Sequence, residues 1–490
     1  MPELDGSGAI ILMHDGGGDR TATIEMLEGL IAQAKEKGYT FSTVAPLLPD
    51  DMQEMQSLKT VEAGLADHAT LTTSMMFLVV PITIMTWLFW FGIIALSVMS
   101  ILYVVLAIIG NRHQQKTQWA AIDAETCPLV SIVLPVFNEQ PVILRTLEAL
   151  KASDYPALDV IAVDDGSTDA TLEILRSFAR GWPQLRVLTQ PNGGKSVASN
   201  LGIKAARGDI IVTLDGDTIF EPQTVRMLAR HFTGTPSGRK VGAVAGHVKV
   251  GNRRNILTAW QSLEYISGIC VTRMAEGLVG AISIVPGACA AWRTEVIREA
   301  GGYSHDTLAE DADLTLTIQR LGYDIVQENR AVAWTEAPMT VKGLAKQRLR
   351  WTFGNIQALY KHRSMILRPK YGVLEMIALP HALLATLIPL LFMPITVVAA
   401  GLSMASGNWE SIAAFAAFVA LTHFVISLVA LTMVEESYWH LAMVPIYRLI
   451  YEPLRAYLLY ASLLQALRGR AVGWYKPERT NSVRTQPVPG

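Results

Sequence analysis

The chain has 490 residues, of which 51% are hydrophobic and 17% are charged. This apolar content exceeds that of an ordinary soluble protein, so part of the chain is expected to lie in a lipid bilayer. The 41 basic and 43 acidic residues give a net charge of −2, which lacks the basic surplus of nucleic-acid-binding proteins and excludes nucleic acid as an expected partner.

The first 110 residues predict an acidic head followed by a membrane segment. Residues 1–70 hold twelve acidic and four basic residues, and 51–73 are expected to be a linker. Residues 74–110 are almost uninterruptedly apolar, longer than the roughly 20 residues that cross a bilayer, and basic residues follow them. The length admits one tilted helix or two joined spans. We expect one crossing, because it places the acidic head outside and the basic flank in the cytosol.

Residues 128–340 alternate between strand-like and helix-like runs. Short β-branched runs at 130–135, 160–163 and 210–214 are separated by stretches such as 142–151 that are typical of helices. This βαβ rhythm predicts an α/β fold with an open, mainly parallel sheet. Ligands bind such sheets outside the carboxyl ends of the strands, which is where the polar motifs of this chain fall.

Two of the strand-like runs end in paired acids. Asp164 and Asp165 follow the run 160–163. Acids at this position can bind the polar edges of a nucleoside or cap the next helix. Asp215 and Asp217 flank a glycine after the run 210–214. These carboxylates form a compact oxygen-ligand site for a hard cation, Mg²⁺ or Mn²⁺, which would neutralise a diphosphate leaving group.

Two further motifs suit a phosphate and a general base. Asn192-Gly193-Gly194-Lys195 offers backbone amides and an ammonium group to a phosphate, although a plain surface loop is the alternative. Glu310 and Asp311 precede a helix. Inverting sugar transfer needs a carboxylate that takes the proton of the acceptor hydroxyl, and Asp311 is the candidate base, with helix capping as the rival interpretation.

The segment 341–372 predicts amphipathic interfacial helices and contains Gln347-Arg348-Leu349-Arg350-Trp351. Arginines can bind a pyrophosphate bidentately, and an indole can stack on a sugar ring. The alternative is a basic helix that lies on anionic lipid, which is compatible with the first role.

The C-terminal third predicts two clear spans, 376–402 and 412–434. The stretch 440–467 is interrupted by ionisable residues, so it is expected to be transmembrane, re-entrant or interfacial. We favour a re-entrant or interfacial course, because the basic tail at 468–490 is then cytosolic.

The motifs, in this order and at these distances, resemble processive glycosyltransferase family 2 synthases, which include cellulose, chitin-oligosaccharide, hyaluronan and poly-N-acetylglucosamine synthases. The motifs are Pro135-Val136-Phe137-Asn138-Glu139, Asp164-Asp165-Gly166, Asp215-Gly216-Asp217, Glu310-Asp311 and Gln347-Arg348-Leu349-Arg350-Trp351. The resemblance covers roughly residues 75–480. It implies a cytosolic GT-A-type catalytic domain, at 128–340, inserted between transmembrane helices.

The resemblance also implies roles for individual residues. The uridine diphosphate sugar would be bound by Phe137, Glu139, Asp165, Lys195, Asp215 and Arg350, and Asp217 would hold the metal. Glu310 and Asp311 would be catalytic, while Gln347, Trp351 and Gly287 would face the acceptor. The implied partners are a UDP-sugar donor, a growing polysaccharide and the lipid bilayer. A small membrane subunit is also compatible with the resemblance.

Within this family, Lys346–Trp351 and Gly473–Arg479 are most similar to bacterial poly-β-1,6-N-acetylglucosamine synthases. In relatives a comparable tail lies near the mouth of the active site, so Trp474 and Arg479 are expected to help close it. Residues 352–355 depart from the small-residue run of those synthases, which leaves the donor sugar open.

Residues 1–50 resemble the closing portion of a polysaccharide deacetylase domain, through Ile10–Asp15, Arg20 and Gly38–Val44. The metal-binding histidines and the catalytic aspartate of that family are absent. We therefore expect an extracytoplasmic remnant without activity.

The expected function is inverting, processive transfer of N-acetylglucosamine from its uridine diphosphate ester to a β-linked polysaccharide. Transfer would be coupled to translocation by a multi-pass protein of the bacterial inner membrane. The alternatives are a β-glucan or chitin-oligosaccharide synthase, a single-addition transferase that acts on a lipid acceptor, and a membrane subunit that conducts or anchors glycan without catalysis.

Overall fold

The computed structural model describes residues 21–41, 72–117, 119, 122, 125, 127–233, 240–371, 373–405, 407, 409–468 and 481–485. The chain divides into two units, residues 1–87 and 88–490, which are described separately. Helix α1, Thr21–Glu36, belongs to the first unit and buries Leu30 and Ala34. Most of the deacetylase-like segment, and both Trp474 and Arg479, lie outside the described residues.

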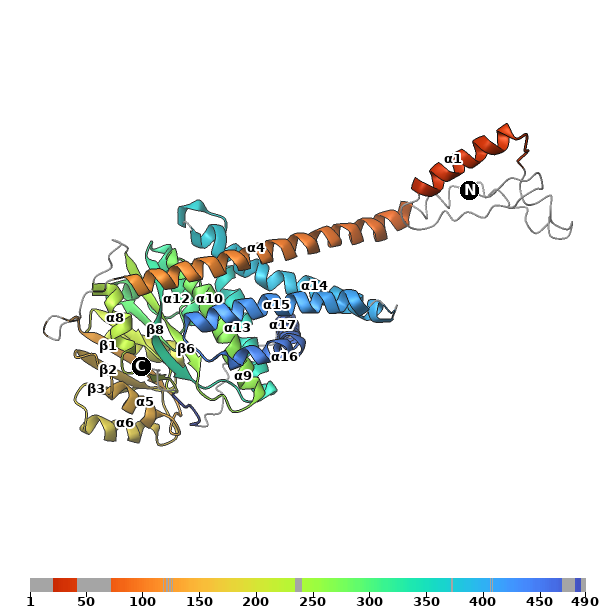
Figure 1. Cartoon of the computed structure of the whole chain (residues 1–490). Helices are drawn as coiled ribbons and strands as arrows, with labels where there is room; N and C mark the ends of the chain where they lie inside the picture. Colours follow the sequence, from red (N-terminus) through yellow and green to blue (C-terminus); the bar gives the residue numbers. More distant parts are fainter. Residues whose placement is uncertain are drawn as a thin grey trace. The chain divides into compact units, whose positions relative to one another are not determined.

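The second unit contains one eight-stranded sheet, seen in Figure 1, in the order β3-β2-β1-β4-β7-β6-β8-β5. The strands are β1 Val130–Val136, β2 Leu158–Asp164, β3 Leu185–Thr189, β4 Ile210–Thr213, β5 Ile219–Phe220, β6 Val241–Val250, β7 Ala290–Arg293 and β8 Asp324–Thr335. Strands β1 to β4 are parallel, with Val133 of β1 level with Ile161 of β2 and Thr213 of β4. Strand β7 runs antiparallel to β4 and β6, so the sheet is mixed.

Helices cover both faces of the sheet. They are α5 Ile143–Lys151, α6 Thr171–Arg180, α7 Lys195–Ala205, α8 Thr224–Thr233, α11 Thr294–Glu299, α12 Glu310–Arg320 and α13 Val341–Lys361. One apolar cluster joins Leu134 of β1 to Leu147 of α5 and Leu175 of α6. A second cluster on the other face joins Val133 to Ala198 of α7. Successive strand residues point to opposite faces, so β1 supplies both clusters.

Three segments, α9 Ile256–Glu264, η3 Tyr265–Cys270 and α10 Val271–Leu278, follow one another without a break. Asn255 caps the first of them, because its side chain accepts from the Thr258 amide at 2.9 Å. The middle segment is a π-helical turn, a feature that is frequent at functional sites. These segments are hereafter called the 256–278 helix.

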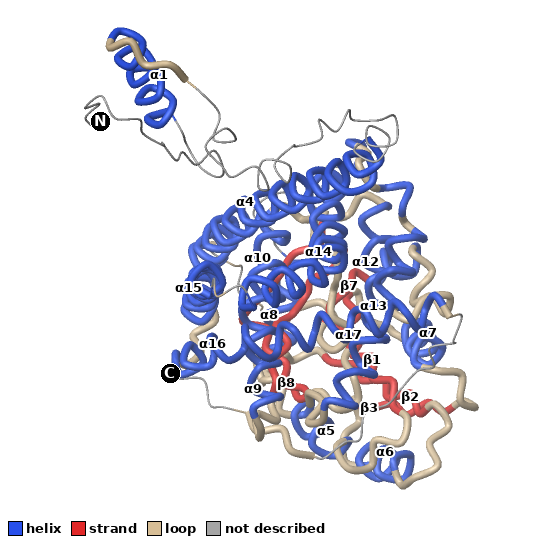
Figure 2. The backbone as a smooth tube through the Cα atoms, turned by 90° about the vertical axis from the view of Figure 1, so that its right-hand side faces the viewer, coloured by secondary structure: helices blue, strands red, loops and turns tan. Residues whose placement is uncertain are grey.

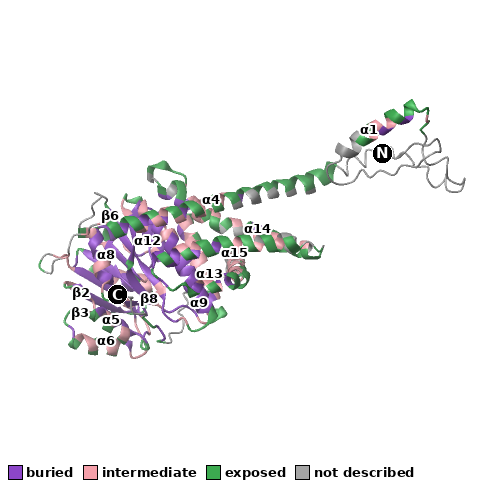
Figure 3. Cartoon of the chain, in the orientation of Figure 1, coloured by how far each residue is buried: buried purple, intermediate pink, exposed green. Residues whose placement is uncertain are grey.

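Three helices of the described chain are long and apolar enough to cross a membrane. They contain Ile94–Lys116 of α4 (Val80–Lys116), Met376–Ala405, which includes α14 (Leu379–Ala405), and Ile412–Met433 of α15 (Trp409–Met433). Helix α4 follows directly on the π-helical η2, Met75–Val79. Much of the apolar surface of these helices is exposed, as the green colour in Figure 3 shows, which suits contact with lipid.

The candidate membrane helices pack against the sheet domain at the 256–278 helix. Figure 2 shows α4, α10 and α15 near one another, and an apolar cluster joins Tyr103 of α4 to Met274 of α10 and Leu431 of α15. At the end of α15, Glu436 forms ion pairs with Lys249 at 3.0 Å and with Arg253 at 3.3 Å. These contacts fix the end of a membrane helix to the sheet.

The stretch predicted at 440–467 contains η7 Tyr438–Met443, α16 Val444–Ile446, η8 Tyr447–Tyr451 and α17 Glu452–Leu467. Its charged side chains lie in ion pairs. Arg455 of α17 lies 2.9 Å from Glu452 and 3.3 Å from Glu264 of α9. This stretch therefore packs on the sheet domain through an ion pair with the buried Glu264.

The tail segment Asn481–Thr485 lies on the sheet domain. The Ser482 amide donates to Glu336 at 2.7 Å, and the Arg484 amide donates to the Gly251 carbonyl at 3.0 Å. Val483 is buried in an apolar cluster with Ile219. Residues 481–485 thus pack on the domain that precedes the two C-terminal candidate membrane helices.

Candidate active site

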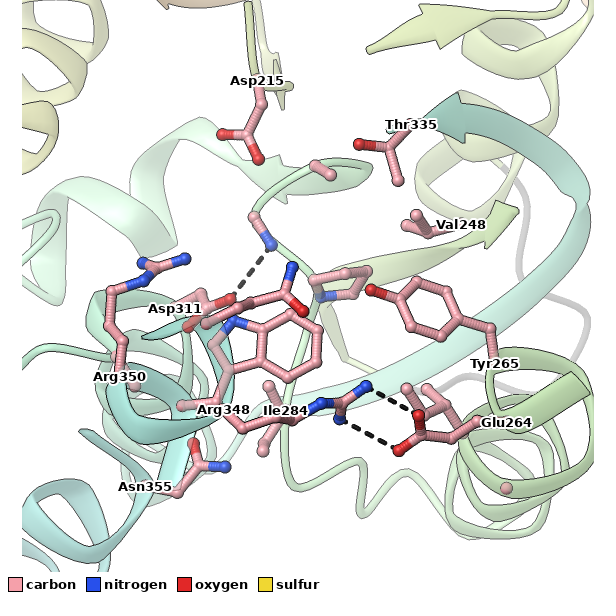
Figure 4. A pocket seen from close by; sticks show the side chains of 18 of the residues that line it. Asp215, Val248, Glu264, Tyr265, Ile284, Asp311, Thr335, Arg348, Arg350 and Asn355 are labelled. Carbon is pink, nitrogen blue, oxygen red and sulfur yellow. Dashed lines mark hydrogen bonds and ion pairs between the residues drawn. The ribbon is translucent and has the colours of Figure 1, made fainter. Parts of the chain in front are cut away.

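One cavity of about 1050 Å³ opens at the strand ends of the sheet and reaches the membrane helices. Twelve of the predicted site residues line it: Phe137, Glu139, Asp165, Lys195, Asp215, Asp217, Gly287, Glu310, Asp311, Gln347, Arg350 and Trp351. Figure 4 shows Asp215 of the sheet and Asp311 and Arg350 of the helices at this cavity. The fold therefore brings together residues that are up to about 210 positions apart, as the edge rule for parallel strands predicts.

Asp165 organises the glycine loop beside β2. One carboxylate oxygen accepts from the Gly193 amide at 2.8 Å and from Gln190 at 2.7 Å, and the other accepts from the Gly194 amide at 2.8 Å. Gly194 has a φ of 88°, which glycine adopts without the steric cost of a Cβ. The following helix α6 has Ala170 at its N-cap, so Asp165 does not cap it. The carboxylate instead holds the loop in a fixed shape.

Lys195 begins α7 directly after this loop. Its Nζ lies 2.6 Å from Asp215 and 3.2 Å from Glu310, so it links the end of β4 to the start of α12. Burial opposes the charge of the ammonium group, but the two carboxylates outweigh it and raise the pKa of Lys195 above its ordinary value. The lysine is therefore a fixed cation at the centre of the cavity.

Asp217 is 3% exposed and accepts a hydrogen bond from the Thr335 hydroxyl of β8 at 3.2 Å. Gly216 beside it is required by packing, because a Cβ there would lie 2.8 Å from Cγ of Glu139. Among the described residues, no group of three or more His, Cys, Asp and Glu side chains is arranged to hold a metal ion alone. A cation at Asp217 would need further oxygen ligands from a bound substrate or water.

Asp311 lies in the first turn of α12, where Ala309 is the N-cap and makes no side-chain capping bond. One oxygen of Asp311 accepts from the Gly287 amide at 3.2 Å and the other accepts from the Ala312 amide at 2.9 Å. Burial, and then the neighbouring Glu310, raise the pKa of Asp311, whereas Lys195 opposes the rise. A carboxylate with a raised pKa is a better proton acceptor, which suits a general base.

The two arginines of the Gln347–Trp351 motif have different surroundings. Arg348 forms a bidentate ion pair with Glu264, at 3.0 and 2.7 Å, as Figure 4 shows. Its guanidinium also lies 4.7 Å from the ring centre of Trp351. Arg350 has no hydrogen bond or ion pair to any described residue, so it is the arginine of this motif that is available to a ligand.

The 256–278 helix forms a cavity wall that the sequence analysis missed. Tyr265 places its ring 6.4 Å from that of Trp351, and Glu264, Arg273 and Glu276 line the cavity. The sequence contained only a weak signal for this cavity wall. Within residues 256–275 the only ionisable acidic or basic groups are Glu264 and Arg273, in an otherwise apolar stretch. Charged residues in an apolar helix mark a polar, protein-lined path.

Comparison with known proteins shows what residues 128–354 are similar to. A family model described as glycosyltransferase like family 2 matches residues 128–354. The poly-beta-1,6-N-acetyl-D-glucosamine synthases of Staphylococcus epidermidis and Staphylococcus aureus are 31% identical over 232 residues, which is 47% of this chain and 56% of theirs. The chain thus spans little more than half the length of the curated relatives that it matches.

Among solved structures, a mannosyltransferase from Pyrobaculum calidifontis, in complex with GDP-Man and Mn²⁺, is similar with a TM-score of 0.51. It is 24% identical, and the match covers 73% of this chain and 97% of that one. This likeness concerns the fold, and it agrees with the mixed α/β sheet described above.

Proposed function

We propose, from the premise that residues 128–354 are a glycosyltransferase family 2 domain, that this protein transfers N-acetylglucosamine from UDP-GlcNAc to a growing β-linked polysaccharide. Transfer would be inverting and processive. The observation that carries the proposal is that Asp165, Lys195, Asp217 and Asp311, from four separate segments of the chain, line one cavity. Glycosyltransferase relatives that make a polymer of N-acetylglucosamine support the choice of donor.

In the proposed mechanism, the loop that Asp165 shapes receives the nucleotide, with Phe137 and Glu139 beside it. Lys195 and Arg350 bind the diphosphate as cations. Asp311 takes the proton of the acceptor hydroxyl as this oxygen attacks the anomeric carbon. The attack comes from the face opposite the diphosphate, so the configuration at that carbon inverts and the new linkage is β.

The residues present fit a divalent cation, because Asp217 and Asp215 offer hard oxygen ligands beside the proposed diphosphate site. When bound, Mg²⁺ or Mn²⁺ would offset the negative charge that develops on the leaving diphosphate. Trp351, whose ring is tilted against that of Tyr265, and Gln347 would hold the terminal sugar of the acceptor, with Gly287 beside it.

The proposed location is the bacterial inner membrane, with the catalytic domain in the cytosol. The tail contacts at Glu336 and Gly251 place residues 481–485 on that domain. Two crossings, by α14 and α15, return the chain to the side from which it left. The interrupted stretch at 438–467 is then interfacial, which supports a cytosolic tail. The proposed exit for the polymer lies among the membrane helices that line the cavity.

The proposal is tested with the full chain, purified in detergent, together with Mg²⁺ or Mn²⁺ and labelled UDP-GlcNAc. Long β-linked products are expected on a gel. Asp311→Asn should lower turnover about 10²- to 10⁴-fold, as loss of a general base does, while UDP binding measured by calorimetry is retained. Turnover that persists in the variant would remove Asp311 as the base.

The alternatives give different products in the same assay. A single-addition transferase on a lipid acceptor would yield one short labelled product, and a β-glucan synthase would prefer the glucose donor in direct competition. A subunit without catalysis would yield no transfer with either donor.

A further inference from the structure

The 256–278 helix directs a cation into the cavity at a place that the proposed donor site does not use. Arg273 lies in α10, two turns after Tyr265, and both line the cavity. Within the described part of the chain, Arg273 has no hydrogen bond and no ion pair. A guanidinium carries five N–H donors, and leaving them without acceptors in a partly buried site is costly unless a ligand or water supplies oxygen atoms.

The other cavity cations are already accounted for. Lys195 is held by Asp215 and Glu310, and Arg348 is held by Glu264. Arg455, which also lines the cavity, is paired with Glu264 and Glu452. Arg350 stands in the motif assigned to the diphosphate. Among the described arginine and lysine side chains that line the cavity, Arg273 is therefore the one whose ligand is unassigned.

Arg273 shares the cavity wall with the proposed base, Asp311, and with Glu276. Burial lowers the pKa of Arg273, and the charges of Asp311 and Glu276 oppose this fall. Glu276 is occupied by Ser283, whose amide and hydroxyl both donate to it at 3.0 Å. Tyr103 of α4 adjoins Glu276, and its ring lies 4.4 Å from that of His381. Arg273 thus lines the same cavity as the base and as Tyr103 and His381 of the candidate membrane helices.

A growing glycan passing from the base toward the membrane presents hydroxyl, ring and acetamido oxygen atoms, all of which accept hydrogen bonds. A guanidinium donates and never accepts, so its chemistry matches such a chain. We propose that Arg273 is an acceptor-binding residue, which donates hydrogen bonds to oxygen atoms of the terminal sugars of the glycan. This inference rests on the proposed function, because it requires that the cavity holds a sugar acceptor.

The test measures initial rates of the full chain with saturating UDP-GlcNAc while an N-acetylglucosamine oligosaccharide is varied. Arg273→Gln should raise the KM for the oligosaccharide about 10- to 100-fold, the range for a lost charge-assisted hydrogen bond. The KM for UDP-GlcNAc and the affinity for UDP should stay within twofold of wild type. Arg320→Gln is the matched control, since Arg320 is exposed at the end of α12 and away from the cavity.

An unchanged KM for the oligosaccharide in Arg273→Gln overturns the inference, and so does a rise confined to UDP-GlcNAc. If Arg273→Gln fails to bind UDP, the test uses Arg273→Lys instead. This variant keeps the positive charge but has fewer N–H donors for the oligosaccharide. A rise of at least threefold in the oligosaccharide KM supports the role, and no rise overturns it. Wild-type protein that elongates no oligosaccharide would refute the proposed function itself, whereas elongation without an Arg273 effect refutes only this inference.

Discussion

Asp313 of α12 accepts from His362 at 2.9 Å, and this contact ties the helix that carries the proposed base to the far end of α13. Both side chains are 4% exposed. Lys361 donates to the second oxygen of Asp313 at 2.8 Å. Burial opposes the charge of Asp313, but the bonds from His362 and Lys361 outweigh it and lower the pKa of the carboxyl group. The acid is therefore ionised and braced from α13.

The first prediction concerns this brace. His362→Leu removes the donor, so α12 should lose its fixed orientation and kcat should fall about tenfold, because small misplacements of a reacting group are costly. His362→Gln keeps an N–H donor and should retain most activity. Steady-state kinetics and UDP calorimetry make the measurement, with the donor KM expected to stay constant.

Asp306→Asn is the control for the brace, because it removes the exposed negative charge beside Lys361 and leaves His362 in place. Equal losses in the two His362 variants, or a loss of UDP binding, would contradict a positioning role.

The second prediction concerns Gly287. A Cβ at this position would lie 3.1 Å from the Nζ of Lys195, which is held by Asp215 and Glu310. Gly287→Ala should displace the ammonium group and raise the KM for the donor up to about tenfold, since a charge-assisted bond is weakened. Gly268→Ala is the matched control, because Gly268 lines the same cavity and its Cβ would meet nothing within 4 Å. Equal kinetics of the two variants would refute the steric argument.

The third prediction concerns the pH dependence of stability. Burial raises the pKa of Glu276 to about 7, although the hydrogen bonds from Ser283 oppose the rise. The pKa of an unfolded glutamate is about 4.3, so the ionised form destabilises the fold and the loss grows as pH rises from about 4 to 7. The cost at pH 8.5 is about 4 kcal/mol at most.

Glu276→Gln keeps an oxygen acceptor for Ser283 without the charge. Its apparent melting temperature in detergent should exceed that of wild type by a few degrees at pH 8.5 and by much less at pH 4.5. A gain of the same size at both pH values would indicate a packing effect and would contradict the assignment.

The fourth prediction concerns the tail. A Cβ on Gly251 would lie 2.5 Å from Cγ1 of Val483, so Gly251→Ala should expel the buried valine and release residues 481–485. Deuterium exchange of the Ser482 and Arg484 amides, which are hydrogen-bonded to Glu336 and Gly251, should accelerate at least tenfold. Gly181→Ala, with its nearest neighbour at 3.8 Å, should leave exchange in the tail unchanged. Unaltered exchange in Gly251→Ala would show that the tail does not depend on this contact.

Several features of the fold and the site follow from local sequence alone. The apolar runs that end at Asp164 and at Asp215 predicted strands, and the ends of parallel strands share one edge of a sheet, so convergence of these acids was foreseeable. The candidate membrane helices at 376–405 and 412–433 were equally predictable, because a run of about 20 apolar residues is long enough to span a bilayer. The antiparallel strand β7 was not predicted, because pairing with β4 is a contact between segments about 80 residues apart.

Only the tertiary structure assigned the individual partners. Arg348 and Arg350 are two positions apart on one helix, so they point about 200° apart, and the motif does not say which of them meets a carboxylate. In the structure Arg348 meets the carboxylate of Glu264, which lies 84 residues upstream. The sequence by itself determined which residue types stand at the ends of strands and which stretches prefer lipid, because periodicity and hydrophobicity act locally. The cavity wall at 256–278, the Asp313–His362 brace and the docked tail depend on packing between distant segments, which no local pattern encodes.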